Sequence, residues 1–162
     1  MKKTKFIKYE IFSALGIMIV GTILHFAYSW SNNNPLVSLF SSVNESVWEH
    51  LKILFYSYLL FTLVGTLIFR NKSYFSNKTI AIYKSLGFII TFYYTYSGII
   101  GQSVPIIDIL SFYLAIIIGQ ISSYKKREIY NFKLIIALLI VTSLAFTIFT
   151  FYPLEIGIFI SP

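Results

Sequence analysis

The chain has six acidic residues and two histidines, and three of these eight fall inside one stretch of nine residues, Asn44–Lys52. The three are Glu45, Glu49 and His50. Histidine is the commonest metal ligand and titrates near neutral pH, and carboxylates serve as oxygen ligands or general bases. The stretch therefore predicts a divalent-cation site or a hydrolytic site, with Glu49, Glu45 and Ser46 as the catalytic candidates.

Helical spacing separates these side chains. At about 100° per residue, Glu49 lies near the stripe of Glu45, whereas His50 diverges from Glu49 by roughly 100°. A single ion at His50 should therefore take its other ligands from different helices. His25 and Asp108 are the candidates, so we expect a zinc ion, or another divalent cation, at His25, His50 and Asp108.

Several of these residues also have a structural explanation. Ser42 and Glu45 have the spacing of a capping box at a helix start. Glu49 can form a salt bridge with Lys52, three residues further on. Asp108 follows Pro105 at another expected helix start, where the helix dipole favours a carboxylate.

The composition of the chain is typical of a membrane protein. It has 162 residues, of which 57% are hydrophobic and 12% are charged. A soluble domain carries roughly twice that charged fraction. Long apolar runs predict an all-α, polytopic transmembrane helix bundle in a single domain, 1–162, and the absence of cysteine excludes thiolate ligands and nucleophiles. We expect five spans, at about 10–29, 47–69, 79–100, 106–122 and 134–152, the first being an uncleaved helix.

Basic residues predict the orientation. Eleven of the thirteen Lys and Arg residues lie in the N-terminal segment or in two expected basic connections, 70–78 and 123–133. The positive-inside rule then puts the N-terminus inside and the C-terminus outside a bacterial plasma membrane. The net charge of +7 is explained by this topology, so we expect no nucleic-acid partner. The histidines, Asp108, Glu45, Glu49 and Glu155 should all lie near the outer face.

The motif Asn44-Glu45-Ser46-Val47-Trp48-Glu49-His50-Leu51-Lys52 resembles the signature of a family of small, uncharacterised bacterial integral membrane proteins. The order of His25, this motif and Asp108 after a short Gly/Pro turn is also similar, over most of the chain. This resemblance implies no known activity.

A weaker similarity is to the membrane hydrolases of the alkaline ceramidase and adiponectin-receptor type. In those proteins a Ser-x-x-x-His on one span and an Asp on the next help to build a zinc site. Ser46-x-x-x-His50 and Asp108 are similar in type. Those hydrolases have seven spans and a later His-x-x-x-His, whereas this chain has five expected spans and two histidines.

Three classes of function stay open at this point. The first is a small integral membrane protein with an outward-facing His/Glu/Asp site for a divalent cation. The second is a zinc-dependent hydrolase acting on lipid or peptide, with Glu49 or Glu45 as general base. The third is a transport, sensing or partner-binding protein without catalysis; haem between His25 and His50 is a further alternative. The expected partners are the lipid bilayer, a lipid or peptide ligand at the outer face and a second copy of the chain.

Overall fold

A computed structural model describes residues 3–125 and 130–162, and within these residues it contains helices and no strand. The predicted all-α fold is therefore confirmed. Residues 126–129, in the expected basic connection 123–133, lie outside the described residues. The elements in order are α1 (Lys3–Trp30), α2 (Pro35–Ser38), α3 (Val47–Phe69), α4 (Lys72–Ile100), α5 (Pro105–Lys125), α6 (Phe132–Phe151) and the short 3₁₀ helix η1 (Gly157–Phe159).

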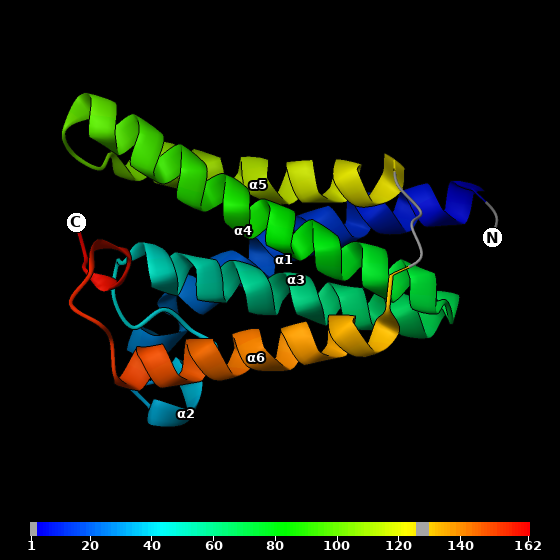
Figure 1. Cartoon of the computed structure of the whole chain (residues 1–162), viewed down its shortest axis with the longest axis horizontal. Coiled ribbons are helices and arrows are strands. Elements are labelled where there is room, and N and C mark those ends of the chain that lie inside the picture. The colour runs from blue at the N-terminus through cyan, green and yellow to red at the C-terminus, as the bar shows by residue number, and fades with distance from the viewer. Residues whose placement is uncertain (1–2, 126–129) are drawn as a thin grey trace.

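Five long helices run up and down a single elongated bundle (Figure 1). The start of α1 and the turn between α3 and α4 lie at one end, which we call the basic end because Lys5, Lys8, Arg70 and Lys72 belong to it. The loop 31–46, the turn 101–104 and the chain's C-terminus lie at the opposite end, the histidine end. The connections thus alternate between the two ends.

Helix α3 is the centre of the bundle. It packs against α1, α4 and α6, and its Leu54, Phe55 and Tyr58 are almost fully buried. By contrast, α1 and α6 expose large apolar side chains such as Leu15 and Val141 along their outer faces. Such a surface suits contact with lipid better than contact with water.

Four helices are long and apolar enough to cross a membrane: α1 from Thr4, α3, α5 as far as Tyr124, and α6. Helix α4 is longer than any of them but is not in this group, because charged and polar side chains interrupt its first half. The apolarity of the helices therefore supports a membrane protein with four candidate spans and does not by itself confirm five.

The predicted basic turn at 70–78 is shorter than expected. Arg70 takes a left-handed conformation with φ of 47° and ends α3, and the Asn71 side chain then accepts hydrogen bonds from the backbone N–H groups of Ser73 and Tyr74. Helix α4 consequently begins at Lys72. The polar residues 73–78, which suggested a loop, are helical, and most of them are buried.

The predicted capping box at Ser42 and Glu45 is wrong. Helix α3 begins at Val47, and Ser46 caps it by accepting a 3.4 Å hydrogen bond from the Glu49 backbone N–H. Ser42 instead donates its hydroxyl proton to the carbonyl of Asn44. Glu45 is therefore in the loop, and its side chain is free of the helix terminus.

Glu49 and Lys52 form a buried ion pair in the first turns of α3. Lys52 Nζ lies 2.6 Å from Glu49 Oε2, and it donates hydrogen bonds to the Ser38 carbonyl at 2.8 Å and to Thr150 Oγ1 at 2.7 Å. These three acceptors match the three protons of an ammonium group. The salt bridge expected between Glu49 and Lys52 is present.

The carboxylate of Glu49 is equally well satisfied. Its Oε2 also accepts a hydrogen bond from the Val43 backbone N–H at 2.9 Å, and its Oε1 accepts one from Thr150 Oγ1 at 3.1 Å. The pair thus joins α3 to the loop 31–46 on one side and to α6 on the other. Such a fully bonded pair holds segments in place, and breaking it leaves a buried charge without a partner.

Lys52→Met should destabilise the protein by about 3–5 kcal/mol, because it leaves the Glu49 carboxylate buried and unpaired. The paired variant Glu49→Gln with Lys52→Met should lose less, because no charge stays uncompensated. Thermal unfolding of detergent-purified protein measures both effects, with Glu155→Gln in the exposed tail as the control. Wild-type stability in Lys52→Met would contradict this role for the pair.

Candidate metal centre

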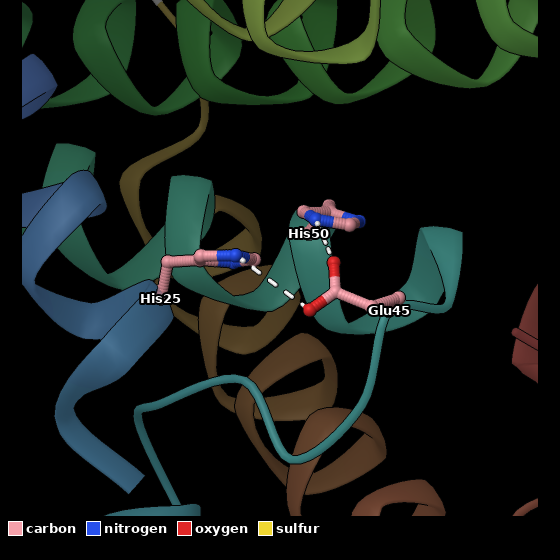
Figure 2. A group of neighbouring side chains, drawn as sticks. All are labelled: His25, Glu45 and His50. Atoms are coloured by element: carbon pink, nitrogen blue, oxygen red, sulfur yellow. Dashed lines mark ion pairs between the residues drawn. The ribbon is translucent and has the colours of Figure 1, made fainter. Parts of the chain in front are cut away.

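His25, Glu45 and His50 converge at the histidine end of the bundle (Figure 2). His25 comes from the last turns of α1, Glu45 from the loop just before α3, and His50 from the first turn of α3. One ligand atom of each residue lies within 4.8 Å of the others. Three segments of the chain therefore bring two imidazoles and a carboxylate to one point.

The distances within this cluster suit a small metal ion. Glu45 Oε1 lies 3.6 Å from His25 Nε2, and Glu45 Oε2 lies 3.5 Å from His50 Nε2. Ligand atoms bound at 2.0–2.2 Å in a tetrahedral zinc site lie about 3.3–3.6 Å from each other. The three side chains could thus hold zinc with small adjustments.

The His50 ring is oriented by its own helix. Its Nδ1 lies 3.0 Å from the carbonyl oxygen of Ser46. A carbonyl can only accept, so Nδ1 is the donor, and Nε2, the nitrogen that faces Glu45, is the atom that would bind a metal. Metal-binding histidines usually have such an outer hydrogen bond, which fixes the ring and the tautomer.

The His25 ring lies almost parallel to that of His50, with ring centroids 5.4 Å apart and an angle of 19° between the planes. Figure 2 shows that each histidine directs one ring nitrogen, Nε2, toward the Glu45 carboxylate. Haem would need to separate the two rings and take an axial nitrogen on each face. This arrangement therefore favours a single small ion over haem.

The loop that carries Glu45 is fastened to the turn of α1 that carries His25. Ser41 Oγ donates a 2.5 Å hydrogen bond to the Leu24 carbonyl and accepts a 2.8 Å bond from the Tyr28 backbone N–H. The Ser42 backbone N–H donates to the same Leu24 carbonyl at 3.3 Å. Together with the Glu49–Lys52 pair, these bonds fix the path of the loop between α1 and α3.

The cluster is open to its surroundings. The Glu45 side chain is 66% exposed, and those of His25 and His50 are 24% and 27% exposed. The hydrogen bond with the His50 imidazole lowers the pKa of the Glu45 carboxyl, and the nearby His25 ring acts in the same direction, against the effect of partial burial. Glu45 is therefore ionised at neutral pH, as a metal ligand must be.

Asp108, expected as the third ligand, is near the cluster but outside it. Its Oδ1 accepts a hydrogen bond from the Tyr96 hydroxyl, whose oxygen in turn accepts a 3.2 Å bond from the Val104 backbone N–H. Asp108 nevertheless lines a cavity of about 30 Å³ together with Glu45 and His50. The group of potential ligand atoms within 4.8 Å of one another contains Glu45 and not Asp108.

The other catalytic candidates lie elsewhere. Glu49 faces Lys52 and Thr150 in the buried pair, and Ser46 caps α3 and orients His50 through its carbonyl. The structure does not bring either side chain to the histidines, so a catalytic role for them stays a prediction. Glu45 is a candidate general base in the sequence analysis, and the structure places it beside the two histidines.

Glu45→Gln should lower the free energy of unfolding by less than about 1 kcal/mol, because the residue is exposed to solvent. The melting temperature should fall only slightly. The folded-state pKa of Glu45 is below its value of about 4.3 in an unfolded chain. Its contribution is therefore present above that pH and is lost as the pH falls through the folded-state pKa.

Melting curves of metal-free wild type and Glu45→Gln at pH 6 and pH 3 measure this. We expect a small difference at pH 6 that becomes smaller at pH 3, with Glu155→Gln matching wild type at both. A difference that is larger at pH 3 than at pH 6 would contradict the ion pairing of Glu45 with the histidines.

Comparisons with known proteins match the chain to one family model and give no activity. No curated protein and no solved structure matches it. The family model is described as a family of unknown function (DUF6512), and it matches residues 1–161. Because the match covers almost the whole chain, the protein belongs to this family of unknown function, DUF6512.

Proposed function

We propose that this chain is a multi-pass protein of the bacterial plasma membrane that binds a divalent cation, zinc foremost, at its outer face. The observation that carries the proposal is the convergence of His25, Glu45 and His50, with ligand atoms within 4.8 Å of one another. Two imidazole nitrogens and a carboxylate oxygen form a ligand set that suits zinc. Three protein ligands leave a fourth position open, as in catalytic or exchangeable zinc sites.

The same proposal includes five spans, with α4 as the third. At 1.5 Å per residue its 29 residues extend roughly 43 Å, more than the hydrocarbon core of a bilayer. Helix α4 packs against both α3 and α5, so neighbouring helices shield its polar first half from lipid. The positive-inside rule then puts the basic end in the cytoplasm and the histidine end outside, where the loop 29–44 and the turn 101–105 contain no Lys or Arg.

Hydrolysis of a lipid or peptide is the second candidate, and Asp108 favours it. Asp108 lines the same cavity as Glu45 and His50, and this cavity has room for about one or two water molecules. Zinc lowers the pKa of a bound water, and a nearby carboxylate can accept its proton. A sensing or transport role would use the same metal ligands without requiring Asp108.

Purified wild-type protein should contain about one zinc per chain after incubation with zinc and removal of the excess, and His25→Ala and His50→Ala should each lose it. Elemental analysis of detergent-purified protein measures the zinc, and Glu155→Gln is the control. The proposal would fail if both histidine variants kept the zinc content of wild type while folded.

Asp108→Asn separates the two candidate functions. We expect this variant to keep its zinc, because Asp108 is outside the ligand cluster. If the protein is a hydrolase, turnover of its lipid or peptide substrate should fall by about 10²–10⁴-fold when a general base is removed. Unchanged turnover would assign the metal to a role other than one that uses Asp108 as a base.

Cysteine labelling tests the five-span topology, and the absence of native cysteine makes the experiment clean. Gln102→Cys and Lys72→Cys put a single exposed thiol at opposite ends of α4. A membrane-impermeant maleimide should label Gln102→Cys in intact cells and Lys72→Cys only after permeabilisation. Equal labelling of both variants in intact cells would show that α4 does not cross the membrane.

A further inference from the structure

A second polar region lies at the basic end, far from the histidines. A cavity of about 140 Å³ lies there at the N-terminus of α4, with walls from α1, α4 and α5. This volume is enough for several water molecules or one small polyatomic ion. Its lining includes Phe6, Asn71, Ser73, Tyr74 and Lys78.

Lys78 is the charged residue of this cavity. Its side chain is only 2% exposed, and its Nζ donates hydrogen bonds to Glu10 Oε2 and Gln120 Oε1. Gln120 Nε2 in turn donates a 3.0 Å bond to Ser13 Oγ. The described residues thus supply two acceptors for three ammonium protons, so Lys78 has one donor left.

Other polar atoms beside Lys78 also lack partners among the described residues. They are Glu10 Oε1 and the hydroxyls of Tyr58 and Tyr74, all buried. Tyr74, which lines the cavity, is 7% exposed, and its ring and that of Tyr58 lie within 6 Å of Lys78 Nζ. Buried polar groups in folded proteins nearly always have a partner, so water or a ligand belongs beside these atoms; Glu10 Oε1 needs a donor, whereas the hydroxyls and the Lys78 ammonium group can donate.

The helices leave space for these hydroxyls. A Cβ atom at Gly65 would lie 2.3 Å from the Tyr74 hydroxyl, and one at Gly119 would lie 2.8 Å from the Tyr58 hydroxyl. Glycine at these two positions therefore lets both tyrosines bring their hydroxyls into the bundle interior. These two hydroxyls have no partner among the described residues, whereas the charged groups of Glu49 and Lys52 have all their hydrogen bonds.

The electrostatics of this end favour a negative ligand. Lys5 precedes the lining residue Phe6, and Arg70 and Lys72 flank the lining residue Asn71. The positive end of the α4 dipole adds to their field. A cavity with basic surroundings and a buried ammonium group concentrates small anions.

We propose that this cavity binds a phosphate group, either free inorganic phosphate or the head group of a phosphomonoester lipid. Lys78 supplies the charge, and the Ser73 hydroxyl is the neutral donor; the Tyr74 ring forms part of the wall, while its hydroxyl faces Gly65 of α3. Phosphate offers several strong acceptor oxygens, which match the unused donor of Lys78 and the Ser73 hydroxyl. The apolar ring of Phe6 at the wall is compatible with either source.

Glu10 competes with such a ligand for Lys78. A carboxylate and a phosphate beside one ammonium group repel each other in a region of low dielectric constant. Removing the charge of Glu10 should therefore strengthen phosphate binding, whereas a merely structural ion pair predicts no gain. This sign is the property that distinguishes a ligand site from a second structural pair.

Two arms test the proposal on full-length protein. Isothermal titration calorimetry with inorganic phosphate in a non-ionic detergent tests the free ion. Native mass spectrometry of protein released from phosphatidylcholine nanodiscs, with or without phosphatidic acid, tests the lipid head group. We expect one saturable ligand per chain in at least one arm, and the arm that responds identifies the source.

The variants are chosen so that the fold is preserved. Lys78→Met alone could unfold the protein by leaving Glu10 unpaired, so the paired variant Glu10→Gln with Lys78→Met removes both charges. It should weaken binding about tenfold or more, because a charge-assisted hydrogen bond is lost. Glu10→Gln leaves Lys78 buried without its carboxylate, so its folding is checked by thermal unfolding, and the folded variant should bind phosphate more tightly than wild type.

Lys84→Gln is the matched control, since it removes the same charge from the same helix. Lys84 is exposed, bonds to Ser122 and does not line the cavity, so this variant should bind like wild type. No saturable binding in either arm would overturn the proposal. Equal losses in Lys84→Gln and in the paired variant would also overturn it, because the binding would then be non-specific attraction to the basic end.

Discussion

Glu49 and Lys52 form an ion pair inside the bundle, and the position of Glu45 depends on that pair. The pair holds the loop 31–46 through the Ser38 carbonyl and the Val43 N–H, and it holds α6 through Thr150. Without these bonds the loop would keep its hydrogen bonds with the end of α1 and the ring contact of Phe40 with Tyr56 of α3. Glu49 and His50 are adjacent in the sequence and have different roles. Glu49 positions the loop, and His50 faces the candidate metal centre, to which the loop contributes Glu45.

The buried and half-buried polar groups of this bundle fall into two kinds. At Glu49 and Lys52 every donor and acceptor has a partner, which is typical of a structural pair. The histidine cluster offers three potential metal-binding atoms within 4.8 Å of one another, and the Glu10–Lys78 cluster contains buried polar atoms without a partner among the described residues. Unused hydrogen-bonding or metal-binding capacity at membrane depth costs free energy, and a bound ligand is the simplest way to recover it.

The helical fold could be predicted because apolar runs and basic connections are local signals. The end of α3 at Phe69 and the reversal near Gly101 follow from residues that are adjacent in sequence. The start of α4 was missed because Ser73, Asn77 and Lys78 suggested a loop, although Asn71 was a readable cap. Their burial depends on contacts with α1 and α5, which no local pattern specifies.

The candidate site was predicted only in part, for the same reason. His25 and His50 were paired on the basis of their depth, which helical rise determines. Glu45, and not Asp108, lies beside the two histidines because the Ser41–Leu24 bonds set the loop path and Tyr96 holds the Asp108 carboxylate, and both are tertiary contacts. Residue spacing within one helix could exclude Glu49 and His50 as joint ligands, but it could not choose between partners on other segments.

X-ray absorption spectroscopy at the zinc edge of the purified, zinc-loaded protein tests the central claim most directly. We expect two imidazole ligands and oxygen ligands at about 2.0–2.2 Å, with one imidazole lost in His25→Ala and in His50→Ala. A spectrum without imidazole scattering, or one that is unchanged in both variants, would contradict a metal centre at His25, Glu45 and His50.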